Sequence, residues 1–271
     1  MAHSGKHTKT FLAIDIGNSH TVIGLFKGES FVAEGRWTST RRRTADETFG
    51  RLHEFLDNAG TDRRQIHGIG ISSVVPELTP VYTSIAKKHF RRKPLIITAG
   101  LDFGICIHYE DPKLLGADRI CNAVAGYAMF GGPLVIIDFG TATTYDVVAS
   151  NGDFLGGVIA PGIETSSVSL HRRTAKLPRL TGKNLYLTGH VIGTNTVTSM
   201  QTGILLGAID AMEGMVKRIQ KDVLTSEARK ATVIATGGFS PFVAAHSRVI
   251  QHVAPHLVLD GIRLIYNRVG R

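Results

Sequence analysis

The sequence is poor in cysteine. Only Cys106 and Cys121 occur among its 271 residues, and no partner ligands are spaced around them. Two such cysteines argue against a disulfide framework and against a zinc site, and a reducing, cytoplasmic environment follows by default. No apolar run approaches the ~18 residues that cross a bilayer. Residues 1–9 are polar and basic without an apolar segment, so we expect a disordered lead and not a signal peptide.

Several functional signatures are also missing. No Gly-x-x-x-x-Gly-Lys-Ser/Thr stretch is present, which excludes a Walker A phosphate loop. The twelve histidines are scattered, and we assign none of them a role. The net charge of +9 leaves two interpretations, an anionic ligand such as a nucleotide or simply a solvated basic surface. The basic clusters lack the interleaved aromatic residues with which single-strand-binding proteins stack bases, which makes a nucleic-acid partner unlikely.

The most informative feature that is present is an internal repeat. Residues 11–25 and 134–148 each consist of a β-rich apolar run, an Asp-x-Gly turn, small polar residues and a second β-rich run. Such runs around a glycine-containing turn predict β-hairpins. The two copies stand about 120 residues apart, far beyond the ~20–50-residue period of solenoid repeats. We therefore expect a duplicated unit, that is, two similar lobes with a cleft between them.

The hydrophobic pattern predicts an α/β fold in which each lobe has a mixed sheet flanked by helices. The lobes are expected over residues 10–115 and 116–271, with residues 116–130 as a connecting helix. The first lobe reads β-β-β-α-β-α-β, and the second begins again with three strands. The expected strands are the hairpins 10–26 and 134–150 and the single strands 30–36, 66–75, 95–98, 154–159, 232–235 and 256–259. The expected helices are 44–59, 78–90, 118–129, 161–173, 194–218 and 262–267, with a further helix after residue 238.

The two aspartates of the repeat, Asp15 and Asp138, end buried strands. A carboxylate in that position is costly unless a cation or hydrogen-bond donors meet it. Gly17 and Gly140 let the backbone approach a ligand closely, and a turn of this kind can hold phosphate oxygens against a hard cation. The alternative is a tight turn in which each aspartate bonds its own backbone.

The segment Gly116-Ala117-Asp118-Arg119 opens a helix. Asp118 is either a helix cap or a general base that orients a hydroxyl during phosphoryl transfer. Arg119 either pairs with a carboxylate of the protein or holds an anionic group of the substrate. The glycines of three further motifs allow either a ligand close to the backbone or a structural turn; the motifs are Gly156-Gly157, Pro161-Gly162 and Thr236-Gly237-Gly238.

Taken in order along the chain, these motifs resemble those of the type III pantothenate kinases, in the superfamily of actin, sugar kinases and heat-shock chaperone ATPases. The resemblance covers residues 10–267 and implies two ribonuclease-H-like lobes. It also implies ATP-dependent phosphorylation of pantothenate to 4'-phosphopantothenate, the first step of coenzyme A biosynthesis, with Mg²⁺ and a monovalent cation, K⁺ or NH₄⁺, in a cytoplasmic homodimer. The motifs that carry it are Asp15-Ile16-Gly17-Asn18-Ser19, Gly116-Ala117-Asp118-Arg119, Asp138-Phe139-Gly140-Thr141-Ala142-Thr143, Gly156-Gly157 with Pro161-Gly162, Asn195-Thr196 and Thr236-Gly237-Gly238.

The resemblance also implies roles for individual residues. Asp118 would be the proton acceptor, Asp138 would coordinate the monovalent cation, and Asp15 would lie near Mg²⁺ through the phosphates. Ser19 stands where the family commonly has threonine and keeps the hydroxyl. The ATP-binding residues would be Asp15, Ile16, Gly17, Asn18, Ser19, His20, Thr21, Val22 and Thr141. The pantothenate-binding residues would be Tyr109, Gly116, Ala117, Asp118, Arg119 and Thr196.

Two other functions remain open at this point. One is a related phosphotransferase that acts on another small alcohol. The other is a regulatory or accessory protein that keeps the fold without the activity. The presence of Asp15, Asp118 and Asp138 argues against the second, because a regulator has no physical need for three costly carboxylates.

Overall fold

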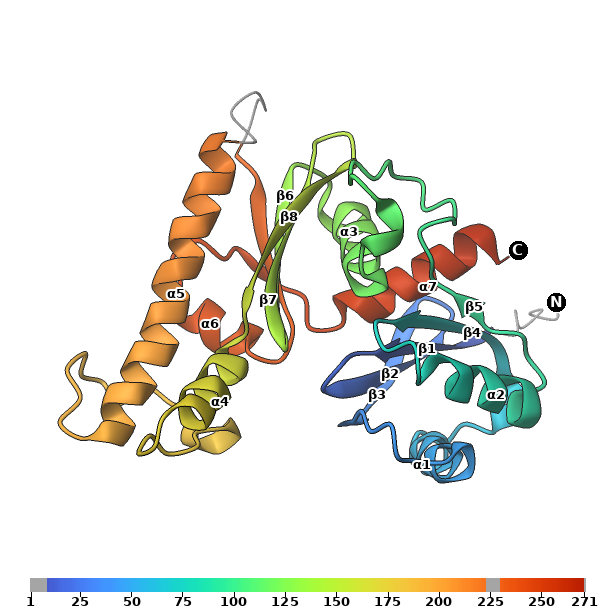
Figure 1. Ribbon diagram of the computed structural model, residues 1–271. Helices are drawn as coiled ribbons and strands as arrows, with labels where there is room; N and C mark the ends of the chain where they lie inside the picture. The colour runs from blue at the N-terminus through green and yellow to red at the C-terminus, as the bar shows by residue number, and fades with distance from the viewer. Residues whose placement is uncertain (1–8, 223–229, 271) are drawn as a thin grey trace, which may run out of the picture. The chain divides into compact units, whose positions relative to one another are not determined.

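The computed structural model describes residues 9–222 and 230–270 (Figure 1). Residues 1–8, which were expected to belong to a disordered lead, lie outside this description. The chain forms two compact units. Unit 1 comprises residues 1–105, 110–125 and 256–271, and unit 2 comprises residues 106–109 and 126–255. None of the described helices is both long enough and apolar enough to cross a bilayer.

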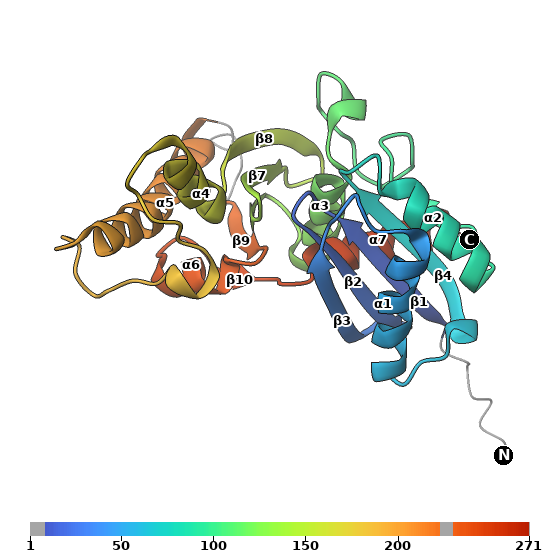
Figure 2. The same ribbon diagram turned by 60° about the horizontal axis from the view of Figure 1, so that its bottom comes forward.

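Unit 1 contains a five-stranded mixed sheet in the order β3-β2-β1-β4-β5, whose strands lie side by side in Figure 2. Strands β1, β2 and β3 are antiparallel, whereas β4 and β5 continue the sheet in parallel with β1. The strands are β1 (Thr10–Ile16), β2 (His20–Lys27), β3 (Ser30–Thr38), β4 (Ile66–Ser73) and β5 (Leu95–Ile96).

Unit 2 repeats this arrangement. Its sheet has the order β10-β9-β6-β7-β8, in which β6, β7 and β8 are antiparallel and β9 and β10 are parallel to β6. Each hairpin therefore provides the central strand of its sheet, and the predicted duplication is confirmed. The strands are β6 (Leu134–Phe139), β7 (Ala142–Val148), β8 (Phe154–Pro161), β9 (Thr232–Thr236) and β10 (His252–Val253).

Helices cover both faces of the first sheet (Figure 1). The apolar side chains of α1 (Ala45–Asn58) and α2 (Thr79–Phe90) pack with Ile14 and Ile16 of β1 in one core. The helix α7 (Leu257–Val269) packs on the other face, where glycines in the strands make room for it. A Cβ on Gly70 would come within 2.5 Å of the side chain of Ile262 in α7.

The second sheet buries its core against α5 (Thr196–Asp222), α4 (Ile163–Arg173) and α6 (Ser240–His246). The helix α3 (Ala117–Phe130) begins in unit 1 and ends in unit 2, where Gly126 lies against Ile136 of β6. Short 3₁₀ turns cover Arg63–Gln65 (η1), Pro112–Leu114 (η2) and Gly182–Asn184 (η3).

The C-terminal segment differs from its prediction. The strand predicted over residues 256–259 is wrong, because Leu257 opens the helix α7 and the strand β10 lies earlier, at His252–Val253. The apolar run Leu257-Val258-Leu259 fits a helix here, because α7 buries Leu257, Leu259 and Ile262. The helix belongs to unit 1, so the compact units divide the chain differently from the boundary expected at residues 115–116.

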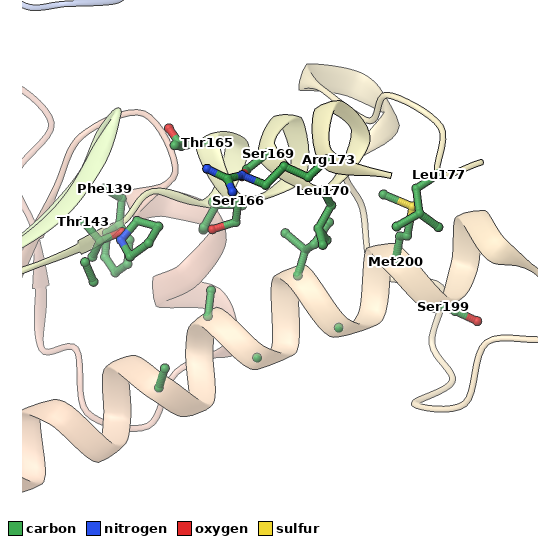
Figure 3. Close-up of a pocket in the computed structure, with 18 of the residues that line it drawn as sticks. Phe139, Thr143, Thr165, Ser166, Ser169, Leu170, Arg173, Leu177, Ser199 and Met200 are labelled. Atoms are coloured by element: carbon green, nitrogen blue, oxygen red, sulfur yellow. The ribbon is translucent and has the colours of Figure 1, made fainter. Parts of the chain in front are cut away.

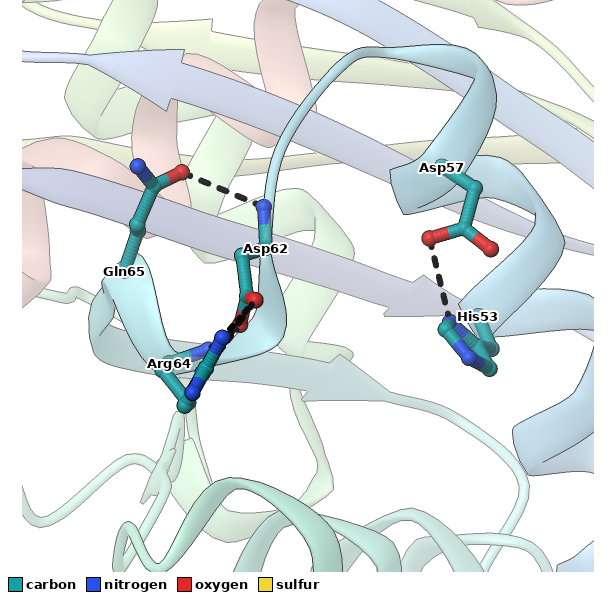
Figure 4. A network of polar contacts seen from close by, with 5 residues as sticks. All are labelled: His53, Asp57, Asp62, Arg64 and Gln65. Atoms are coloured by element: carbon teal, nitrogen blue, oxygen red, sulfur yellow. Dashed lines mark hydrogen bonds and ion pairs between the residues drawn. The ribbon is translucent and has the colours of Figure 1, made fainter.

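A small polar network on the surface fixes the connection between α1 and β4 (Figure 4). Asp62 caps η1, since its carboxylate accepts from the backbone N–H of Arg64 at 2.8 Å. The side-chain oxygen of Gln65 in turn accepts from the backbone N–H of Asp62. The hydrogen bonds and charge of Arg64 lower the pKa of Asp62. These groups are solvent-exposed, so the network shapes the turn but adds little to the free energy of unfolding.

Candidate active site

The two Asp-x-Gly turns differ in length. In unit 1 Asp15 pairs with Val22, and the three residues 17–19 separate β1 from β2. The N–H of Gly17 donates to the carbonyl of His20 at 3.0 Å. In unit 2 Asp138 pairs with Thr144, and the turn is one residue shorter. The register therefore makes Thr21 the counterpart of Thr143, since each pairs with the last residue of the preceding strand.

The carboxylate of Asp15 is fixed from the neighbouring strand. Because β1 and β4 are parallel and in register, Asp15 lies directly beside Ser72. The Ser72 hydroxyl donates to Asp15 Oδ1 at 2.8 Å, and Ser72 is completely buried. Hydrogen bonds to charged groups are roughly twice as strong as those between neutral groups, so this bond restrains the carboxylate at the end of β1.

Asp118 lies in the first turn of α3. Its Oδ1 accepts from the backbone N–H of Arg119 at 2.8 Å, and the carboxylate lies so close to Gly116 that a Cβ there would collide with it. Burial raises the pKa of Asp118, while its hydrogen bond with Arg119 and the charge of that residue partly oppose the effect. The Arg119 side chain is itself buried, with 6% of its surface exposed. A buried carboxylate of raised pKa is a better proton acceptor than an exposed one.

Cys121 lies near both of these carboxylates within unit 1. Its thiol is fully buried. Burial and the negative charges of Asp15 and Asp118 raise the pKa of Cys121 well above its usual range. Both carboxylates are thus close enough to act on one sulfur atom, so the end of β1 and the start of α3 lie near each other. The roles that the resemblance implies for Asp15 and Asp118 stay predictions.

The segment after β4 contacts both the turn that follows Asp15 and the segment that carries Asp118. The N–H of Val74 donates to the carbonyl of Ile16 at 3.0 Å. The side chain of Val74 also lies 3.5 Å from the position that a Cβ on Gly116 would take. Val74 therefore contacts both the turn that follows Asp15 and the segment that carries Asp118.

The two cysteines should differ strongly in reactivity. Cys106 is exposed, whereas Cys121 is buried and its raised pKa keeps it protonated. Because the thiolate is the reactive species, we expect one thiol to react quickly with Ellman's reagent in the native protein and a second only in denaturant. A Cys106→Ser variant should lose the fast phase. Rapid reaction of both thiols in native protein would contradict the buried position of Cys121.

In unit 2, Asp138 ends β6 beside a glycine that no other residue could replace without strain. Gly237 has φ of +84°, and a Cβ there would collide with Asp138 Oδ1 and come within 2.7 Å of the Phe139 nitrogen. Both the positive φ and the close approach of Asp138 and Phe139 therefore require glycine at 237. A carboxylate surrounded by backbone suits a hard cation, although the described residues contain no cluster of three His, Cys, Asp or Glu side chains that could hold a metal ion alone.

The other predicted residues of unit 2 lie in three places. The exposed Thr141 is part of the turn between β6 and β7, and its carbonyl accepts from the Thr165 hydroxyl at 2.6 Å and from Gly162 N–H at 3.2 Å. Thr196 is the first residue of α5. The ring centroid of Tyr109 lies 6.3 Å from that of Phe154 in β8. The roles that the resemblance implies for these three residues stay predictions.

A mainly apolar cavity of about 1070 Å³ lies between α4 and α5 (Figure 3). Thr196 lines one part of it and Phe139 and Thr143 another, whereas Asp138 and Thr141 are not among its lining residues. Arg173 is the single charged side chain that lines it. The cavity is therefore suited to apolar contacts and not to a triphosphate.

Sequence reasoning missed Ser72 and Cys121. Ser72 could have been found, because it lies in the later part of the predicted strand 66–75, and the ends of neighbouring parallel strands lie at the same sheet edge. Cys121 stands three residues after Asp118 and therefore on the same face of a helix. Its contact with Ser72 depends on the packing of α3 against the sheet, which no local pattern reveals.

The family model and the curated relatives identify the same family. Residues 11–218 match the model of the type III pantothenate kinase family. The type III pantothenate kinase of Roseiflexus castenholzii is 44% identical over 255 residues, which cover 94% of this chain and 97% of that protein. A solved candidate transcriptional activator of the Baf family from Campylobacter jejuni has a TM-score of 0.58 at 19% identity, over 95% of this chain and 98% of that one. A candidate N-acetylmannosamine kinase from Listeria monocytogenes has a TM-score of 0.51 at 11% identity, over 97% of this chain and 100% of that one.

Proposed function

This chain belongs to the type III pantothenate kinase family, and from that premise we propose which role each residue has in phosphoryl transfer. The enzyme phosphorylates pantothenate with ATP in the pathway to coenzyme A, and the reaction requires a divalent metal. The observation that best supports our assignment of residues is that Ser72 donates to the Asp15 carboxylate, while Asp15 and Asp118 both raise the pKa of the buried Cys121 thiol. Phosphoryl transfer needs little more than positioning, charge neutralisation and a proton acceptor.

The phosphates of ATP are expected at the first turn. We assign them to the segment from Asp15 to Val22, in which Gly17 lets the backbone approach closely and Asn18, Ser19 and Thr21 bring polar side chains. His20, Ile16 and Val22 shape the same turn from the adjoining strands. Thr141, exposed at the second turn, is assigned to ATP as well.

The alcohol is expected at the start of α3. Asp118 accepts the proton of the attacking hydroxyl as the new P–O bond forms, because a free alcohol loses its proton only far above neutral pH. The guanidinium of Arg119 binds the carboxylate of pantothenate through its planar fork. Gly116 and Ala117 line the approach to Asp118, and Tyr109 and Thr196 are assigned to pantothenate by resemblance alone.

The carboxylate oxygens of Asp15 and Asp138 indicate which ions bind at the site. We infer that Mg²⁺ is the divalent metal and that Asp15 holds it mainly through the phosphates and water, as Mg²⁺ prefers. Asp138 fits a monovalent cation, K⁺ or NH₄⁺, because its carboxylate lies against the backbone around Gly237. When bound, these ions neutralise charge that develops on the transferred phosphoryl group.

The assembly is proposed to be a homodimer in the cytoplasm, with no nucleic-acid partner. The apolar cavity between α4 and α5 supports the dimer, because its lining residues suit contact with protein better than contact with water. Light scattering that gave the mass of a single 29.3 kDa chain would contradict the dimer.

Two other functions remain to be separated from this one by experiment. Purified protein should release ADP with pantothenate, Mg²⁺ and K⁺ present, and should do so poorly with sugars or other small alcohols. Preference for another alcohol would reassign the substrate within the superfamily. Specific DNA binding at physiological salt in a protein without kinase activity would favour an accessory role instead.

A further inference from the structure

One buried residue without an assigned role supports the carboxylate of Asp15. Ser72 lies near the end of β4 and exposes no surface to solvent. Its hydroxyl donates to Asp15 Oδ1 at 2.8 Å. This bond joins the end of β4 to the end of β1.

The strand register explains why this bond forms. The strands β1 and β4 are parallel, and Asp15 pairs with Ser72 across them. A serine hydroxyl has a single hydrogen, and Ser72 donates it to Asp15. Because Ser72 is fully buried, bulk water does not compete for this hydrogen.

We propose that Ser72 is a positioning residue which fixes the carboxylate of Asp15. The inference rests on the proposed function, in which Asp15 lies near the Mg²⁺–ATP phosphates. The terminal torsion of an aspartate is broad, so an unsupported carboxylate samples several orientations. Groups that support a metal or phosphate ligand in this way typically alter affinity by ~10–100-fold when removed.

The test is a pair of variants and their combination. Ser72→Ala should raise the KM for Mg²⁺–ATP about 10-fold or more while the KM for pantothenate changes little. Asp15→Asn should also raise the KM for Mg²⁺–ATP. In the double variant, Ser72→Ala should add little to the effect of Asp15→Asn, because Ser72 acts through that carboxylate. A merely structural role would give additive effects and would move both KM values.

A matched control lies next to Ser72. Ser73→Ala removes the neighbouring hydroxyl, whose hydrogen bonds go to Val75 and Thr79, and should leave the KM for Mg²⁺–ATP unchanged. Ser72→Cys keeps a side chain of similar shape with only a weak donor, and should raise the KM in the same direction as Ser72→Ala but less. Thermal unfolding and calorimetric binding of a non-hydrolysable ATP analogue with Mg²⁺ are measured for every variant.

The outcomes separate the inference from the function on which it rests. A strong effect of Asp15→Asn with none from Ser72→Ala overturns the positioning role alone. Equal effects of Ser72→Ala in the presence and absence of the Asp15 carboxylate overturn it as well. If Asp15→Asn changes neither the kinetics nor the binding of the analogue, the phosphate role of Asp15 is wrong and Ser72 has nothing to position. If Ser72→Ala does not fold, Ser72→Cys decides the question by the same comparison with Asp15→Asn.

Discussion

Replacement of Asp118 by asparagine should lower kcat by about 10²–10⁴, the usual contribution of a positioned acid or base. Asparagine keeps the shape of the side chain and an oxygen that can accept from the Arg119 N–H, a bond that is 2.8 Å long in the structure. It cannot accept a proton. The loss should therefore appear in kcat, while the KM values for ATP and pantothenate change much less.

The same substitution should leave the fold at least as stable. Burial raises the pKa of Asp118, so ionisation of its carboxylate destabilises the native state when the pH exceeds the pKa of an ordinary aspartate. At lower pH the carboxyl group is protonated in both the folded and the unfolded protein, and this destabilisation vanishes. The gain in Tm of Asp118→Asn should therefore be absent at acidic pH and grow as the pH rises towards neutrality.

The matched control is Asp111→Asn, which removes an exposed carboxylate that caps η2 in the same unit. It should change kcat little. The raised pKa also predicts that the acidic limb of the kcat/KM profile lies at a higher pH than an ordinary aspartate would give. Near-full turnover of Asp118→Asn would remove Asp118 from the role of proton acceptor.

Replacement of Asp138 by asparagine should have the second largest effect, on the requirement for a monovalent cation. The K⁺ concentration that gives half-maximal activity should rise at least about 10–100-fold, the range found when even a supporting residue of a metal site is removed. The carboxylate is held against the backbone at Gly237, so the amide should occupy the same space. Titration of activity with K⁺, at constant ionic strength and saturating Mg²⁺–ATP, provides the measurement.

The control in the same unit is Asp153→Asn, a carboxylate that pairs with His108 at 3.0 Å and takes no part in the proposed site. Its K⁺ titration should match that of the unmodified protein. An Asp138→Asn variant with unchanged dependence on K⁺ would show that the cation is not bound by this residue.

The duplicated hairpins could be predicted from the sequence because their signals are local. Each run of β-branched residues ends in an Asp-x-Gly turn, and strand periodicity and turn chemistry act over only a few residues. The helix α1 was equally clear, since Thr44 and Glu47 form a capping box that the structure contains. Repetition of these local signals was enough to predict two similar lobes, each with a mixed sheet.

The features that the sequence did not reveal depend on tertiary contacts. The contact between Ser72 and Cys121 requires α3 to pack against the end of β4, and the two residues are far apart in the chain. The run Leu257-Val258-Leu259 was mistaken for a strand because a short apolar segment fits a buried helix equally well. The one-residue difference between the two turns shows only in the strand register.

The most direct test is to follow the γ-phosphoryl group itself. Purified protein is incubated with γ-labelled ATP, pantothenate, Mg²⁺ and K⁺, and the products are identified by mass spectrometry and phosphorus NMR. We predict that the label moves to the primary hydroxyl of pantothenate, and that Asp118→Asn transfers it at least about 10²-fold more slowly. Label that remains on ATP, or that appears only as inorganic phosphate, would contradict the assignment of this site as a pantothenate kinase.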